Sequence, residues 1–68
     1  MFYVNTELIG NYMKEHNMTT REFAKLCSVP MTAVTRVIHT KTSYNIVFLF
    51  RVACGMDIDM RKLIEKEI

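Results

Sequence analysis

Apolar side chains recur every three or four positions along most of the chain, which is the spacing of one face of an α-helix. The first such face is formed by Leu8, Ile9, Tyr12, Met13 and His16. Either Asn5 or Thr6 can cap the start of this helix with its side-chain oxygen. We therefore expect a first helix from Asn5 or Thr6 to about His16.

A capping box marks the start of a second helix. Thr19 and Glu22 have the spacing at which the hydroxyl accepts from one backbone amide and the carboxylate accepts from the other. The helix is expected to run from Thr20 to Cys27. Its core face is formed by Phe23, Ala24 and Cys27.

Pro30 separates the second helix from a third. Its ring clashes with a preceding helical turn and it has no N–H, yet its fixed φ suits the first position of a new helix. We predict a corner at Ser28 and Val29 and a third helix from Pro30 to about Ile38. Its inward residues are Val34, Val37 and Ile38, and its outward residues are Met31, Thr32, Thr35 and Arg36.

The rest of the chain is expected to be helical as well. After a polar loop over residues 39–43, a fourth helix is predicted from about Ser43 to Cys54, with Gly55 as its C-cap. Its expected inward stripe is Ile46, Phe50, Ala53 and Cys54. A fifth helix is predicted to follow Asp57 and to carry Ile58, Met60, Leu63 and Ile64. The predicted fold is all-α, a compact five-helix bundle with a helix-turn-helix, in one domain over residues 1–68.

The fourth helix has more apolar residues than one buried face needs. Phe48, Leu49 and Val52 lie outside the predicted inward stripe. They form a dimer interface together with Leu63 and Ile64, or they are covered by the fifth helix and by the N-terminal residues 2–4. An exposed apolar stripe of this size marks a partner surface, so the first alternative predicts a homodimer.

The composition narrows the class of protein. A chain of 68 residues, half of them hydrophobic, is long enough for one small folded domain. No apolar run approaches the roughly 18 to 20 residues that cross a bilayer. The start, MFYVNTEL, lacks the basic region and long apolar region of a signal peptide. We expect no membrane partner and a cytoplasmic location.

The residues that carry chemistry are few. Cys27 and Cys54 lie in apolar surroundings and are interpreted as reduced core thiols of a cytosolic protein. Together with His16 and His39 they match no structural zinc spacing. The sequence also has no catalytic constellation and no Gly-rich phosphate loop. We expect no metal, no cofactor, no small-molecule substrate and no enzymatic activity.

The charge is unevenly distributed, although the net value is only +2. Residues 1–22 and residues 57–68 each carry a slight acidic excess. Residues 23–56 contain no Asp or Glu, and their basic residues are Lys25, Arg36, Lys41 and Arg51. The middle of the chain is therefore the one part with a basic field, which favours an anionic partner there.

Two short helices joined by a tight corner, the second with a polar outward face, are typical of a helix-turn-helix. The chain also resembles the Cro and repressor (XRE-like) family of lambda-repressor-like DNA-binding domains, over roughly residues 6–64. The matching stretches are T-T-R-E-F-A-K-L-C-S-V, V-T-R-V and V-A-C-G-M. The likeness implies a left-handed corner at Ser28, where the family usually has Gly. It also implies a contact between Met13 and Ile38, where the family often pairs Arg with Glu.

The resemblance further implies a sequence-specific regulator of transcription, of bacterial or phage origin, whose third helix enters the major groove of double-stranded DNA. The base-reading positions would be Met31, Thr32, Thr35 and Arg36. Thr20 and Arg21 would hold a phosphate at the start of the second helix, where amides and the helix dipole favour an anion. The other phosphate contacts implied are His39, Lys41, Thr42, Ser43 and Tyr44.

A second interpretation is a protein-interaction module that keeps the helix-turn-helix without specific DNA readout. Met31 favours it, because a Met side chain makes no bidentate hydrogen bond to a base edge. Arg36, Lys41 and the acid-free middle of the chain favour DNA binding.

Overall fold

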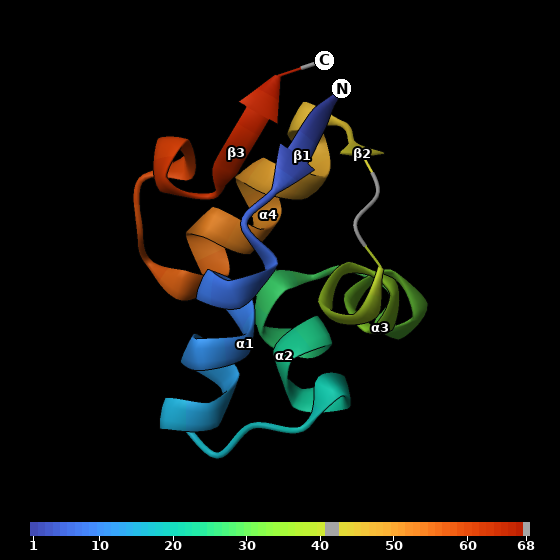
Figure 1. Cartoon of the computed structure of the whole chain (residues 1–68). Coiled ribbons are helices and arrows are strands. Elements are labelled where there is room, and N and C mark those ends of the chain that lie inside the picture. The colour runs from blue at the N-terminus through green and yellow to red at the C-terminus, as the bar shows by residue number, and fades with distance from the viewer. Residues whose placement is uncertain (41–42, 68) are drawn as a thin grey trace.

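The computed structural model describes residues 1–40 and 43–67, which form four α-helices and one three-stranded sheet (Figure 1). The all-α five-helix prediction is therefore wrong. In chain order the elements are β1 (Phe2–Val4), α1 (Thr6–Glu15), α2 (Thr20–Cys27), α3 (Met31–His39), β2 (Ser43–Tyr44), α4 (Ile46–Met56), the 3₁₀ turn η1 (Met60–Lys62) and β3 (Ile64–Glu67).

The sheet joins the two ends of the chain, and it replaces the fifth helix. Its strand order is β2-β1-β3, and both pairs are antiparallel. Phe2 lies opposite Tyr44 on one side and Glu67 on the other. The segment after Asp57 makes only a short 3₁₀ turn, in which the Asp59 carboxylate accepts from the Arg61 amide at 2.9 Å. The chain then extends along β1, because β1 offers unpaired backbone groups on that side.

Side-chain caps fix where the helices begin. The Asn5 side chain accepts from the amide of Leu8 at 3.2 Å, and both hydrogen bonds of the Thr19–Glu22 capping box are present. The predicted bounds of α2 are confirmed. The Asn45 side chain caps α4, so this helix starts at Ile46 rather than at Ser43, whose backbone belongs to β2.

The end of α4 also differs from the prediction. Gly55 lies inside the helix, and the residue that ends it is Asp57, in the left-handed conformation at φ 57°. Gly55 has a different role, since a Cβ there would lie 2.5 Å from Sγ and 3.0 Å from Cα of Cys27. The absence of a side chain at Gly55 therefore lets α4 pack closely on α2.

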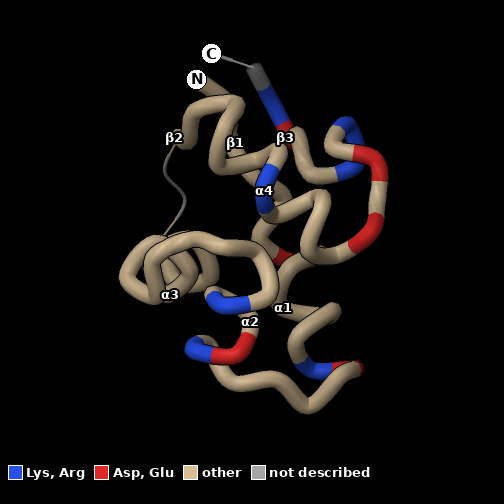
Figure 2. The backbone as a smooth tube through the Cα atoms, turned by 180° about the vertical axis from the view of Figure 1, so that it is seen from behind, with Lys and Arg blue, Asp and Glu red and all other residues tan. Residues whose placement is uncertain are grey.

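The core lies between the four helices and one face of the sheet. Its largest fully buried side chains are Phe23, Ile9, Leu49, Leu63, Val4, Val34, Val37 and Val52. α4 passes behind β1 in Figure 1 and in front of it in Figure 2, so it covers one face of the sheet. No helix in residues 1–40 or 43–67 is long and apolar enough to cross a membrane.

The buried face of α4 is not the predicted one. It is formed by Leu49, Val52, Ala53 and Met56. Of the predicted inward stripe only Ala53 is buried, and Ile46, Phe50 and Cys54 are exposed. Apolar residues cover two neighbouring sides of this helix. The side that faces α2 and the sheet is buried, and the side that was predicted to be buried is mostly exposed.

Met13 and Ile38, the predicted contact between the first and third helices, lie on elements that pack together. Met13 is buried, and Ile38 is half-buried against the core. The burial of Met13 agrees with the prediction, Ile38 is buried only in part, and their direct contact stays a prediction.

Candidate nucleic-acid interface

The corner between α2 and α3 is a tight left-handed turn. Ser28 has φ 57° and ψ 44°, as the resemblance implied. The amide of Ser28 donates to the carbonyl of Lys25 at 3.3 Å, and the amide of Val29 donates to the carbonyl of Ala24 at 3.0 Å. These two bonds satisfy carbonyls at the end of α2 and turn the chain sharply.

Arg51, a surface residue of α4, binds the backbone of this corner. The Arg51 guanidinium donates through Nη1 to the carbonyl oxygen of Ser28 at 2.8 Å. Sequence reasoning missed this contact, because the two residues are 23 positions apart and no local pattern joins them. Arg51 therefore ties the helix-turn-helix to the rest of the domain while its side chain stays at the surface.

The outer face of α3 carries the predicted base-reading residues. Met31, Thr32, Thr35 and Arg36 are all exposed. Val34 and Val37, on the opposite side, have no exposed surface. The predicted outward face is confirmed, as is the inward face for Val34 and Val37, whereas the third inward residue, Ile38, is half-buried. The role of the outward residues in base reading stays a prediction.

At the start of α3, no acidic side chain offsets the partial positive charge of the helix N-terminus. Pro30 is the N-cap, with φ −63° and ψ 142°, rather than the first helical residue. No side chain caps this end, and its first turn contains no acidic residue. The first backbone amides and the helix dipole therefore favour an anion at this end.

The hydroxyl of Thr35 is already engaged. Its Oγ1 donates to the carbonyl of Met31 at 3.1 Å, one turn earlier in α3. The oxygen keeps its acceptor capacity, so Thr35 suits a donor such as an adenine or cytosine amino group.

The start of α2 is less suited to a phosphate than the start of α3. Arg21 is exposed and Thr20 is half-buried. However, Oε1 of Glu22 accepts from the amide of Thr19 at 2.8 Å, which places a carboxylate at the same helix end. An arriving phosphate would meet the Arg21 cation together with this negative charge.

The end of α3, where His39 is the last helical residue, and the segment after it only partly match the predicted phosphate contacts. His39 is exposed and Ser43 is half-buried, whereas Lys41 and Thr42 lie outside the described residues. Tyr44 is buried, and its ring stacks on Phe48 with centroids 4.6 Å apart. Its hydroxyl is also buried and has no hydrogen-bond partner among the described residues. Tyr44 therefore belongs to the core of the sheet, and its hydroxyl is not accessible to a phosphate.

The residues predicted for a dimer interface lie mostly inside the chain. Leu49, Val52 and Leu63 have no exposed surface, and Phe48 and Ile64 are half-buried against the core. The exposed apolar residues of α4 are instead Ile46, Val47 and Phe50. The cause is the one given above for α4: the side of the helix that faces the core is not the side that was predicted.

Acidic residues are absent from α3. Figure 2 shows them on α1, at the start of α2, in the turn after α4 and on β3. The charge segregation along the sequence thus persists in the folded chain, and the outer face of α3 has Arg36 as its charged residue.

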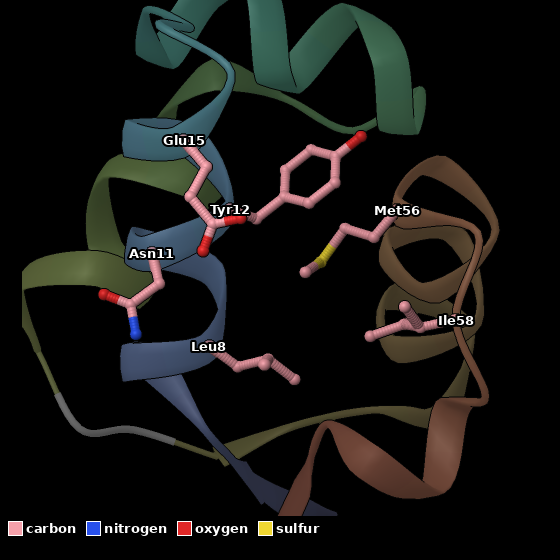
Figure 3. A pocket seen from close by; sticks show the side chains of 6 residues that line it. All are labelled: Leu8, Asn11, Tyr12, Glu15, Met56 and Ile58. Atoms are coloured by element: carbon pink, nitrogen blue, oxygen red, sulfur yellow. The ribbon is translucent and has the colours of Figure 1, made fainter.

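A shallow hollow lies away from this face, between α1 and the end of α4 (Figure 3). Its volume is about 190 Å³, and it is lined by Leu8, Asn11, Tyr12, Glu15, Met56 and Ile58. The Leu8 and Tyr12 side chains point across it toward those of Met56 and Ile58. The lining is mostly aliphatic and aromatic, and it includes no residue of α2 or α3.

The two cysteines differ in environment. Cys27 is buried, with Sγ 3.8 Å from the carbonyl oxygen of Val52, and desolvation raises the pKa of its thiol to about 11. Cys54 is exposed, so only one of the two is the predicted core thiol. No group of three or more His, Cys, Asp or Glu in residues 1–40 and 43–67 is placed to hold a metal ion.

No family model, curated protein or solved structure matches the chain. The fold is a small domain of four helices and a three-stranded sheet, in which a tight corner joins α2 to α3. The resemblance to the Cro and repressor family stays a prediction.

Proposed function

We propose that the chain is a cytoplasmic, sequence-specific DNA-binding regulator of transcription, whose α3 enters the major groove of double-stranded DNA. The observation that carries this proposal is the outer face of α3. It combines an exposed polar stripe, an uncapped N-terminus and the Arg36 cation in a segment without acidic residues. A helix placed in the major groove reads base edges through such a face.

The phosphate contacts of the proposal are fewer than the sequence implied. Of the predicted contacts, the exposed Arg21 and His39 and the half-buried Thr20 and Ser43 remain, and Lys41 and Thr42 are retained from the sequence alone. The amides at the start of α3 are a contact that the sequence analysis did not include. Tyr44 is withdrawn because its hydroxyl is buried. Few phosphate contacts give weak binding by one copy of the chain. Binding as a homodimer to two half-sites supplies the affinity that one copy lacks.

The alternative, a protein-interaction module, is favoured by the exposed apolar side chains of α4. The two functions are not exclusive, because these side chains do not belong to the outer face of α3. The test below separates them.

The experiment measures fluorescence anisotropy of labelled duplex DNA, first a random pool at low salt and then sequences selected from that pool. We expect wild type to bind, and Arg36→Ala to lose about 1–3 kcal/mol on the selected site if Arg36 makes a bidentate base contact. The matched control is Arg61→Ala, an exposed arginine of η1 whose guanidinium pairs with Asp59 at 2.7 Å. This control is expected to bind like wild type.

Two outcomes would change the proposal. Equal losses by Arg36→Ala on selected and random DNA would assign Arg36 to a phosphate. No binding to any duplex at low salt would remove the DNA-binding function and favour the interaction module.

A further inference from the structure

The carbonyl oxygen of Ser28 needs a hydrogen-bond donor that the adjoining backbone does not supply. Ser28 ends α2 in the left-handed conformation, and the chain then continues into Pro30, which is extended at ψ 142° and has no N–H. The amide of Val29 already donates to the carbonyl of Ala24 at 3.0 Å. A carbonyl in such a corner is satisfied only by water or by a side chain from elsewhere in the chain.

The guanidinium of Arg51 supplies this donor from another helix. Its Nη1 lies 2.8 Å from the Ser28 oxygen, although the two residues are 23 positions apart. The bond joins α4 to the point at which α2 ends and the chain turns toward α3. Arginine suits this role, because its guanidinium is always charged and holds its donors in a fixed plane.

The distribution of acidic residues leaves Arg51 available for this bond. Residues 23–56 contain no Asp or Glu, so the acids nearest in sequence are Glu22 and Asp57. Glu22 accepts from the amide of Thr19 at the opposite end of α2. Asp57 follows α4, about 9 Å further along the helix axis than Arg51. A carboxylate closer to Arg51 would compete with the carbonyl of Ser28 for the guanidinium.

From this geometry we infer that Arg51 is a positioning residue for α3: it fixes the angle at which α3 leaves the corner, and so aligns the outer face of α3 with the base edges. The inference rests on the proposed function. The left-handed conformation of Ser28 is strained, so the corner does not keep its geometry by local preference alone. Without Arg51 the corner would relax and α3 would tilt, while the buried Val34 and Val37 still hold it to the core.

A tilt of α3 would affect the reading of bases more than the binding of phosphates. Hydrogen bonds to base edges depend on distance and angle, whereas phosphate contacts are largely electrostatic and independent of sequence. The predicted base-reading residues all lie on α3, so a tilt displaces them together. Arg51 is therefore expected to contribute to the preference for one DNA sequence over others.

The first test examines the corner in the absence of DNA. Amide hydrogen exchange, followed by NMR, reports how often a backbone hydrogen bond opens. In Arg51→Met, which keeps a long side chain and removes every donor, the amide of Val29 is expected to exchange about five- to tenfold faster. The amide of Met13, inside α1, should keep its wild-type rate. An unchanged rate at Val29, or equal acceleration at Val29 and Met13, would overturn the proposal.

The second test compares the affinities for a selected duplex and for the random pool. Arg51→Met is expected to lose at least tenfold more affinity on the selected duplex than on the pool. The matched control is Lys25→Met, which removes one positive charge from an exposed residue of α2, three positions before Ser28. This control should change both affinities by the same factor. Arg51→Lys should recover part of the preference, because an ammonium can still donate to the carbonyl.

The salt dependence of binding separates positioning from direct contact with DNA. If Arg51 bound a phosphate, Arg51→Met would lose affinity equally on both duplexes, and the slope of log K against log salt would be less steep by about one per copy. The positioning role predicts an unchanged slope. Equal losses together with a less steep slope would overturn the proposal.

The inference and the proposed function fail in different ways. If wild type binds no duplex, the DNA-binding function is removed, and the exchange rates still decide whether Arg51 holds the corner. If wild type prefers a selected duplex and Arg51→Met keeps both that preference and the wild-type exchange rates, the positioning role is removed and the DNA-binding function stands.

Discussion

At the scale of the residue, Ser28 shows how the corner is made at a cost in stability. A residue with a Cβ in the left-handed region is strained by about 1–2 kcal/mol relative to Gly. Asn17 and Asp57 also have positive φ, but short polar side chains of that kind tolerate it better. The corner at Ser28 is therefore held by its surroundings, which include the bond from Arg51.

This strain gives a prediction for Ser28→Gly. Glycine relieves the strain in the folded chain. It also raises the conformational entropy of the unfolded chain, which lowers the free energy of unfolding by about 0.4–1 kcal/mol. We expect a net gain of about 0.5–1 kcal/mol in the free energy of unfolding, measured by urea denaturation. Ser28→Ala is the control, because it removes the hydroxyl and keeps the Cβ, and it should give no gain. A destabilised Ser28→Gly would show that the hydroxyl, not the backbone, decides this position.

The two thiols give a second prediction at this scale. Burial raises the pKa of Cys27 to about 11, so at pH 8 its reactive thiolate is scarce and also inaccessible. We expect iodoacetamide to label the exposed Cys54 first and to label Cys27 only when the chain unfolds. Mass spectrometry of peptides after timed labelling measures both rates. Equal rates in the folded protein would contradict the burial of Cys27.

At the scale of the element, the local signals in the sequence were reliable. The Thr19–Glu22 capping box and the corner before Pro30 act within a few residues, so the bounds of α2 and the two faces of α3 followed from the sequence. The exposure of the base-reading candidates could be predicted for the same reason.

Other features depend on contacts between distant segments and could not be predicted in this way. β1 and β3 pair across almost the whole chain, and their short runs have no periodicity that separates a strand from a helix. α4 is apolar on nearly all sides, so its pattern does not select a buried face. Four candidate site residues changed for these reasons. Tyr44 is part of the sheet, and Leu49, Val52 and Leu63 are buried in the core.

The packing of α2 on α4 yields a prediction for the two glycines. In Gly55→Ala the new Cβ would lie 2.5 Å from Sγ of Cys27, and the backbone of Cys27 is also close, so the helices must separate. We expect a loss of about 1–3 kcal/mol in the free energy of unfolding. The matched variant is Gly10→Ala, in α1, where no atom lies within 4 Å of the added Cβ.

Gly10→Ala should instead stabilise the chain by about 0.5–1 kcal/mol, since Ala is the better helix former. Thermal or urea denaturation of both variants measures the difference. Two changes of the same sign would contradict the close approach of α4 to Cys27.

At the scale of the whole molecule, charge and apolar surface are divided between different faces. Acidic residues are absent from α3, whereas the exposed apolar residues Ile46, Val47 and Phe50 lie on α4. This division separates the surface that is proposed to bind DNA from the exposed apolar surface of α4. The net charge of only +2 predicts that the binding of DNA is moderate rather than strong.

The most direct test of the central claim is the affinity of the chain for duplex DNA as a function of salt concentration. Binding through α3 by a dimer, with the two cations Arg36 and Lys41 of each copy facing the DNA, neutralises about four phosphate charges and predicts a slope of about −3.5 for log K against log salt. Lys41→Ala should weaken binding to all duplexes alike and make this slope less steep, because Lys41 is proposed to bind a phosphate. An affinity that does not change with salt, or no binding at the lowest salt, would contradict the account.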